Sequence, residues 1–170
     1  MPDSFRAFDH KSITDNVFEL IGKQWMLVTA GEMDDFNTMT ASWGGFGHLW
    51  NRDICWCVIR PQRYTYEFAE KYDYFTLTFF EEEHRDKLRL CGTKSGRDID
   101  KMAETGLSPR TTANGSVYFE QARLVIDCRK IYHQDIDPIN FLDPKIDEEY
   151  PEKDYHRMYL GEVTGCLIRE

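Results

Sequence analysis

The sequence of 170 residues lacks the patterns that identify several common classes of enzyme and binding protein. It has no phosphate-binding P-loop, no nucleophile elbow, no zinc-protease helix motif and no dinucleotide-binding fingerprint. No run of Lys and Arg occurs, and the formal net charge of -9 disfavours a nucleic-acid partner. The apolar runs are far too short to cross a membrane. We therefore expect neither a nucleic-acid partner nor a membrane partner.

Cysteines are few and have no metal-binding spacing. The five are Cys55, Cys57, Cys91, Cys128 and Cys166. Their number is odd, they are widely spread, no C-x-x-C occurs, and no histidine lies near Cys55 and Cys57 in sequence. Together with the lack of a secretory signal segment, this predicts reduced thiols in a cytoplasmic protein and no metal site.

The composition is that of one globular domain spanning residues 1–170, with residues 1–15 as an extended arm. Hydrophobic residues make up 41% and charged residues 30% of the chain, which argues against disorder. Aromatic residues reach 14%. They can fill a core, cover a dimer face or line a pocket for a flat ligand.

The hydrophobic pattern predicts about six strands with short helices between some of them. Residues 32–36 read as a turn, residues 135–154 as a surface loop, and the strand over 117–132 as bent or bulged midway. No βαβ alternation occurs, so we expect a mainly antiparallel sheet closed into a barrel. The predicted strands are 24–30, 37–43, 54–59, 74–80, 117–132 and 158–168, and the predicted helices are 64–71, 81–90 and 98–105.

Three segments contain groups suited to binding a ligand. Residues 37–47 (NTMTASWGGFG) form a strand of small and hydroxyl side chains, against whose backbone a flat ligand can lie. Residues 60–65 (RPQRYT) place two guanidiniums, a phenol and a hydroxyl at the start of a helix, which suits an anion. Residues 92–97 (GTKSGR) add two cations before another helix. Singly, these could be a tightly packed strand, a surface turn and a plain loop. Together they predict a site for a planar ring that carries a phosphate.

Four runs, MTASWGGFG, VIRPQRYTYEF, YFTLTFF and LRLCGTKSGRDIDK, resemble the flavin reductase-like, FMN-binding split-barrel family, in particular its flavoredoxin-like branch. The resemblance extends over roughly residues 25–163. It implies a mainly β, antiparallel, Greek-key-like split barrel with short helices, which forms a homodimer with one FMN per subunit. It further implies that electrons pass from NAD(P)H to flavin, or that the protein is an FMN electron carrier. Asp53 departs from the family pattern, in which we expect Pro or a neutral residue.

The resemblance also assigns cofactor-binding roles by position. It places the isoalloxazine ring against Thr40, Ala41, Ser42 and Trp43, with Asn37 and Trp43 near the ribityl-phosphate side. It places Arg60, Arg63, Tyr64 and Thr65 around the phosphate, with Lys94 reaching in from the CGTKSGRD loop. No catalytic acid, base or nucleophile is expected, because the cofactor itself carries the redox step.

Three functions remain open at this point. The chain could be an enzyme that reduces FMN, or a substrate accepted by the flavin, with NADH or NADPH. It could be a carrier whose bound FMN passes electrons between protein partners without direct use of NAD(P)H. It could also be a non-redox module that holds another planar or phosphate-bearing ligand, such as haem. The electron acceptor, a protein or a small molecule, stays undetermined.

Overall fold

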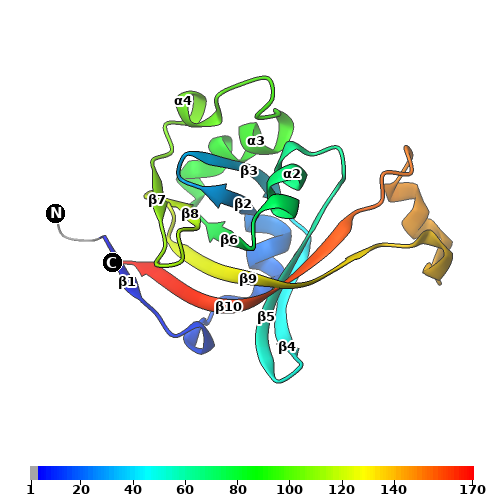
Figure 1. Ribbon diagram of the computed structural model, residues 1–170, viewed down its shortest axis with the longest axis horizontal. Helices are drawn as coiled ribbons and strands as arrows, with labels where there is room; N and C mark the ends of the chain where they lie inside the picture. Colours follow the sequence, from blue (N-terminus) through cyan, green and yellow to red (C-terminus); the bar gives the residue numbers. More distant parts are fainter. Residues whose placement is uncertain (1–3) are drawn as a thin grey trace.

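The computed structural model describes residues 4–170, and its largest element is one antiparallel sheet of eight strands (Figure 1). Seven strands follow the order β3-β2-β6-β9-β10-β5-β4, and β1 pairs with the end of β10. A separate hairpin, β7-β8, packs beside the sheet. The strands are β1 Phe5–Ala7, β2 Met26–Glu32, β3 Asp35–Ala41, β4 Gly44–Leu49, β5 Arg52–Ile59, β6 Tyr74–Phe79, β7 Pro109–Thr111, β8 Val117–Phe119, β9 Leu124–Asp135 and β10 Arg157–Arg169. The predicted fold class, mainly antiparallel β with short helices, is confirmed.

The sheet curls into a barrel that is split along β10. Over Arg157–Glu162 one edge of β10 pairs with β5, whereas near its end, at Leu167–Arg169, that strand pairs with β1 instead. The curl brings β4 back towards β6. Three strands separate β4 from β6 in the sheet, yet the rings of Phe46 and Phe79 lie only 6.1 Å apart. The barrel interior is therefore closed by side chains from strands that are not neighbours in the sheet.

Strand β2 is buried on both faces. Its successive side chains point to opposite faces of the sheet and so enter two different cores. Met26, Val28 and Ala30 belong to the core inside the barrel. Leu27 belongs to a second core on the outer face, beneath the β7-β8 hairpin and the helix α3. A strand with both faces covered reads as a continuous apolar run, which is what residues 26–28 show in the sequence.

Short helices cover the sheet near the end of β3. Helix α2 buries Phe68 against the inner core, and α3 buries Leu88 in the outer core. Helix α4 begins later than predicted because the carboxylate of Asp100 caps it, accepting the backbone N–H groups of Met102 and Ala103. The helical segments are η1 His10–Ser12, α1 Val17–Glu19, η2 Leu20–Gln24, α2 Tyr64–Lys71, η3 Glu82–His84, α3 Arg85–Thr93, α4 Lys101–Thr105, η4 Pro138–Asn140 and η5 Pro144–Glu149. Within residues 4–170, none of these has the length and apolar character needed to span a membrane.

Gly44 and Gly45, expected to end a strand, instead begin β4, which the sequence pattern did not predict. A Cβ atom on Gly44 would lie 2.5 Å from the carbonyl oxygen of Trp56, and one on Gly45 would lie 2.4 Å from its indole nitrogen. Glycine is required here because β4 approaches β5 too closely for a side chain. These glycines therefore mark a close strand pairing rather than a turn.

The long strand predicted over 117–132 is two strands, β8 and β9, separated by the turn at 120–123. The expected irregularity occurs in the pairing of β9 with β10, whose register shifts between Leu160 and Gly161 and again between Val163 and Gly165. The predicted turn at 32–36 is shorter than expected, since β3 already begins at Asp35.

The N-terminal segment is more ordered than the predicted arm. Residues 1–3 lie outside the described residues, but β1 pairs with β10 and η1 packs against the β4-β5 hairpin. The unexpected Asp53 makes this second contact: its carboxylate lies 2.8 Å from Nε2 of His10 and 2.8 Å from Nδ1 of His48. These hydrogen bonds hold the pKa of Asp53 well below its usual range. Asp53 thus joins the hairpin to the N-terminal segment.

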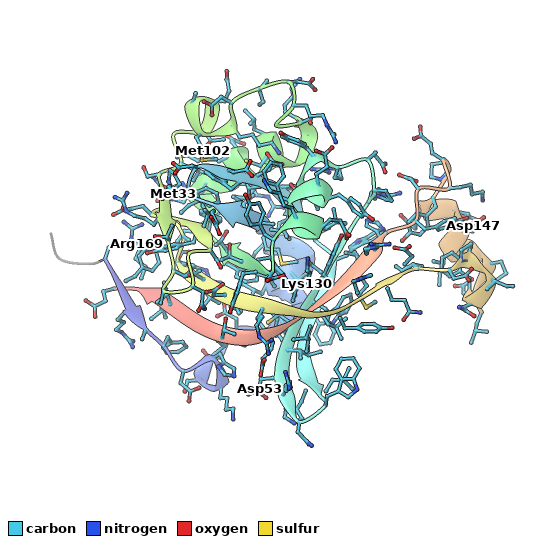
Figure 2. The ribbon with its side chains drawn as sticks, in the orientation of Figure 1. Met33, Asp53, Met102, Lys130, Asp147 and Arg169 are labelled. Carbon is cyan, nitrogen blue, oxygen red and sulfur yellow. The ribbon has the colours of Figure 1, made fainter. Side chains whose placement is uncertain are left out.

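Residues 136–156, here called the distal arm, connect β9 to β10 and extend away from the barrel; Figure 2 labels Asp147 on it. The predicted surface loop is correct in that most of the arm is exposed, including Ile139 at 83% and Leu142 at 99%. The arm nevertheless contains two 3₁₀ turns and returns to the barrel at Tyr150 and His156, both of which are buried.

Candidate functional site

A hollow of about 200 Å³ lies where β3 ends. Six of the predicted cofactor-binding residues line it: Thr40, Ala41, Ser42, Trp43, Arg60 and Arg63. The ladder between β2 and β3 ends at Ala41, and β4 begins at Gly44, so Ser42 and Trp43 lie between two strands. Trp43 is 41% exposed at the wall of this first hollow.

Strand β3 is the last strand of the sheet order, so its outer edge is not paired with another strand of that sheet. Backbone groups on such an edge are free to hydrogen-bond other partners. The protein itself makes two hydrogen bonds in this region: the Thr38 carbonyl accepts from the ammonium of Lys101, and the side-chain hydroxyl of Thr40 donates to the carbonyl of Leu88 on α3. The backbone of 41–43 continues this edge into the first hollow.

A second hollow of about 330 Å³ contains the remaining predicted residues, Asn37, Tyr64, Thr65 and Lys94, and shares Arg63 with the first. The ten predicted cofactor-binding residues therefore line two neighbouring hollows with Arg63 between them. Helix α2 begins at Tyr64, so its first turn lines the second hollow. At that start the amide of Asn37 donates to the buried Thr65 hydroxyl at 2.8 Å, which fixes both side chains.

The second hollow is strongly cationic in an otherwise acidic chain. Four cationic side chains line it, Arg63, Lys94, Arg97 and Lys101, together with one carboxylate, that of Asp98, while Arg97 is also ion-paired with Glu67. Lys94 is exposed, and within residues 4–170 its ammonium group has no hydrogen-bond or ion-pair partner. Local cations at contact distance outweigh distant surface acids, because salt screens charges beyond about 8–10 Å.

Arg63 is half-buried, and no carboxylate in the described part of the chain pairs with it. Its hydrogen bond to the Cys91 carbonyl is long, at 3.5 Å. Burial, and the nearby charge of Arg60, lower the pKa of Arg63 from its ordinary value. An incompletely compensated guanidinium between the two hollows is suited to an anionic group on a ligand.

Arg60 lines the first hollow and is held by the distal arm, although the resemblance assigns it to the phosphate. Its guanidinium lies 2.8 Å from the carboxylate of Asp154, donates to the Glu149 carbonyl at 3.0 Å and stacks 4.8 Å from the ring centre of Tyr150. These contacts use much of its donor capacity, so Arg60 connects the arm to the wall of the first hollow.

Lys101 is a site residue that the sequence did not reveal. It is only 5% exposed, and its ammonium donates to the carbonyls of Thr38 at 2.6 Å and Cys91 at 3.0 Å. Burial lowers the pKa of Lys101 to about 8. It lies in the helix α4, and its position follows from long-range packing that no local motif signals.

His156 is a second residue that sequence reasoning missed. Its ring lines the first hollow, lies 5.1 Å from the ring of Trp43 and is 8% exposed. Burial, with the charge of Arg60 as a further cause, lowers the pKa of His156 to about 4. The ring is therefore neutral at physiological pH.

The donor set fits a flavin mononucleotide. The first hollow offers strand-edge backbone and small side chains to a flat ring, and the second offers cations, a hydroxyl and a helix start to a phosphate. No group of three or more His, Cys, Asp or Glu able to hold a metal ion occurs among residues 4–170.

The comparison with family models settles the family. The model of the flavin reductase like domain matches residues 18–170. The chain belongs to this family. No curated protein matches the chain.

Solved structures of flavin reductase-like proteins share this fold. An FMN-binding domain of a flavin reductase-like enzyme from Shewanella baltica has a TM-score of 0.70 and 17% identity, covering 97% of this chain and 77% of its own. Flavoredoxin of Desulfovibrio vulgaris has a TM-score of 0.68 and 18% identity, with coverages of 97% and 78%. An NADH:FAD oxidoreductase from Streptomyces globisporus has a TM-score of 0.62 and 13% identity, with coverages of 86% and 81%. These findings confirm the family resemblance seen in the sequence.

Proposed function

We propose that this chain binds FMN and transfers electrons through it as a flavin-dependent oxidoreductase. The observation that supports this most directly is the junction of the two hollows at Arg63, with strand-edge backbone on one side and four cationic side chains on the other. The isoalloxazine ring would lie against Thr40–Trp43, and the phosphate would lie among Arg63, Thr65 and Lys94. When bound, the flavin supplies the hydride and electron chemistry.

The side chains of the site bind and orient rather than react. Thr65 is fixed by Asn37 and presents its hydroxyl at the start of α2, while Lys94 provides an exposed point charge. Neutral His156 and the indole of Trp43 form one wall of the first hollow. No acid, base or nucleophile of the chain is assigned a catalytic role.

The proposed electron donor is NADH or NADPH, which makes the protein a reductase rather than a carrier. The family of the chain supports this assignment, as does its structural similarity to an NADH:FAD oxidoreductase. Its structural similarity to a flavoredoxin supports the alternative, an FMN electron carrier. Both functions use the same residues, so the distinction depends on the response to nicotinamide.

An absorption spectrum of the purified protein with added FMN, followed by anaerobic titration with NADH and then NADPH, tests the proposal. Bound flavin bands that bleach within seconds support the reductase. Bands that persist with both nucleotides but bleach with a reduced protein partner contradict the reductase and support the carrier. Failure to bind FMN, or a haem spectrum, contradicts both and supports a non-redox module.

We further propose a homodimer in the cytoplasm. The exposed aromatic pair Trp50 and Tyr132, whose rings lie 5.6 Å apart, offers apolar surface for a second copy. All five cysteines are free thiols, as expected in a reducing compartment. Sedimentation equilibrium at micromolar concentration tests the dimer, and a monomer there contradicts it.

A further inference from the structure

The distal arm presents three apolar side chains to solvent, here called the apolar tip. Ile139 is 83% exposed, Leu142 is 99% exposed and Ile146 is 42% exposed. Ile139 and Ile146 lie on the turns η4 and η5, and Leu142 lies between the two turns. Because the arm extends away from the barrel (Figure 1), the barrel leaves these side chains uncovered. Apolar side chains exposed to this extent at neighbouring positions are typical of an interaction surface.

Acidic side chains surround the apolar tip in the sequence. Residues 136–156 contain seven Asp and Glu against two Lys, so the arm holds more than half of the chain's net charge of -9. The carboxylates of Asp147 and Asp154 are paired with cations. Three further acidic residues, here called the acidic rim, are exposed and have no cationic partner within residues 4–170: Glu148, Glu149 and Glu152.

The arm is held in one position by its own hydrogen bonds. The backbone N–H of Ile136 donates to the carbonyl of His156 at 2.9 Å, which closes the base of the arm. Asp137 and Asp143 cap the two 3₁₀ turns, each accepting a backbone N–H group at 3.0 Å. Arg60 holds the segment that returns to the barrel. A surface organised in advance loses little conformational freedom when a partner binds to it.

Aromatic rings connect the arm with the wall of the first hollow. Phe141, next to Leu142 of the apolar tip, has its ring 6.2 Å from that of Tyr150. The ring of Tyr150 lies 5.4 Å from that of His156. The ring of His156 in turn lies 5.1 Å from that of Trp43, which is 41% exposed at the first hollow. The arm and the wall beside the proposed flavin ring are therefore parts of one packed unit.

Resting on the proposed function, we propose that the distal arm docks a basic redox protein that accepts the electrons of the bound flavin. Apolar side chains of the partner cover the apolar tip, and its lysines and arginines lie opposite the acidic rim. An apolar centre with charged surroundings of complementary sign is the usual composition of a protein interface. One reduced FMN passes one electron to each of two partner centres, becomes oxidised FMN and releases two protons to solvent.

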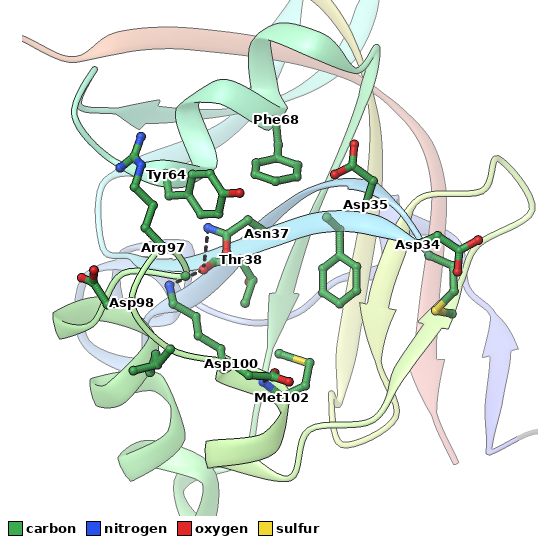
Figure 3. A pocket seen from close by; sticks show the side chains of 15 residues that line it. Asp34, Asp35, Asn37, Thr38, Tyr64, Phe68, Arg97, Asp98, Asp100 and Met102 are labelled. Carbon is green, nitrogen blue, oxygen red and sulfur yellow. Dashed lines mark hydrogen bonds between the residues drawn. The ribbon is translucent and has the colours of Figure 1, made fainter.

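A second copy of the chain suits the arm less well, because it has the same acidic arm and the same net charge of -9. One cluster of its cations lies at the second hollow. There Arg97 is already paired with Glu67, and Asp98 and Asp100 lie on the same segment as Arg97 (Figure 3). The second hollow is also the proposed phosphate site. The charge of the arm therefore favours a basic partner of a different kind.

Calorimetric titration of the FMN-loaded protein with oxidised cytochrome c, a basic haem protein, measures docking. Binding at about 10 mM ionic strength should weaken at least about tenfold at about 150 mM, because salt screens the attraction. The triple variant Glu148→Gln, Glu149→Gln, Glu152→Gln should weaken binding about tenfold at the lower ionic strength. Leu142→Ser should weaken it about fivefold and leave the salt dependence unchanged.

A second triple variant is the matched control for charge. Glu81→Gln, Glu82→Gln, Glu83→Gln removes three exposed carboxylates between β6 and α3, outside the arm. It changes the net charge by the same amount as the triple variant of the acidic rim. The affinity for cytochrome c should change by less than about twofold.

Stopped-flow mixing with cytochrome c measures the electron transfer itself, using FMN-loaded protein reduced anaerobically by light and EDTA. The triple variant of the acidic rim should lower the second-order rate constant about tenfold at low ionic strength. The same variant should reduce 1,4-benzoquinone, a small uncharged acceptor, at the rate of the parent chain. This comparison separates a loss of docking from a change in the flavin.

The inference is overturned if cytochrome c does not bind, if bound cytochrome c is not reduced, or if both triple variants weaken binding equally. It is also overturned if the parent chain is a dimer in sedimentation and Leu142→Ser makes it a monomer, because a second copy then covers the apolar tip. FMN binding with any of these results leaves the proposed function intact. If FMN does not bind, the proposed function fails, and titration of the unloaded chain then decides docking alone.

Discussion

The hydroxyl of Tyr150 lies 2.8 Å from Nδ1 of His156, and this contact joins the distal arm to the wall of the first hollow. Burial raises the pKa of Tyr150, so the phenol stays protonated and can share a hydrogen bond with the neutral imidazole. His156 is thus held by the distal arm in a position beside the proposed flavin ring.

Replacing His156 by Gln is expected to make the free energy of unfolding less dependent on pH below pH 7. Burial lowers the pKa of His156 to about 4 from 6.5, so between these values the unfolded chain binds a proton that the folded chain does not. Stability from this group is therefore present above pH 6.5 and is lost as the pH falls towards 4. Between pH 7 and pH 4.5, urea unfolding of the parent chain should lose about 2 kcal/mol more than that of His156→Gln. Parallel losses in the two proteins would show that His156 is protonated in the fold.

Lys94→Ala is expected to weaken FMN binding about tenfold, because an exposed lysine acts on a phosphate as a single point charge. The free energy of unfolding should stay unchanged, since Lys94 has no side-chain partner within residues 4–170. Lys145→Ala, an exposed lysine on the distal arm, is the matched control and should leave FMN affinity unaltered. Equal affinities of the two variants by fluorescence titration would remove Lys94 from the site.

The parts of the site that the sequence predicts are those encoded by local signals. Residues 60–65 stand out because a buried strand, a proline and a helix start follow in order, and each has its own local pattern. The small residues 40–42 stand out for the same reason. Strand β4 was missed because its glycines serve close pairing with Trp56, a contact that a single sequence does not display.

The parts that the sequence does not predict depend on distant segments coming together. Lys101 reaches the carbonyl of Thr38, 63 positions away, only after α4 has packed against β3. His156 reaches Trp43 only because the distal arm folds back onto the barrel. Both are buried polar residues whose partners are long-range, so neither the residue type nor its neighbours in sequence signal a role.

FMN affinity is expected to fall as the pH rises through the pKa of Lys101. Burial lowers that pKa to about 8, so the ammonium loses its proton above pH 8 in the free protein and must regain it to bind the phosphate dianion. FMN should bind about tenfold more weakly at pH 9 than at pH 7. Riboflavin, which has no phosphate, should show no such loss, and Lys101→Met should remove the dependence for FMN. An unchanged pH profile in Lys101→Met would exclude Lys101 from phosphate binding.

The two arginines of the RPQRYT segment are expected to have different roles, and one pair of variants separates them. Arg63→Ala should lower FMN affinity at least about tenfold, because Arg63 is half-buried between the hollows and has no carboxylate partner among residues 4–170. Arg60→Ala should instead release the distal arm, since Arg60 contacts Asp154, Glu149 and Tyr150.

Limited trypsin digestion checks the second part of this expectation, because the arm offers cleavage sites after Lys145 and Lys153. Arg60→Ala should be cut there faster than the parent chain, while its FMN affinity changes by less than about threefold. Arg63→Ala should resist the protease as the parent does. The reverse pattern, with weak FMN binding in Arg60→Ala and a protected arm, would mean that Arg60 leaves Asp154 to bind the phosphate when the cofactor enters.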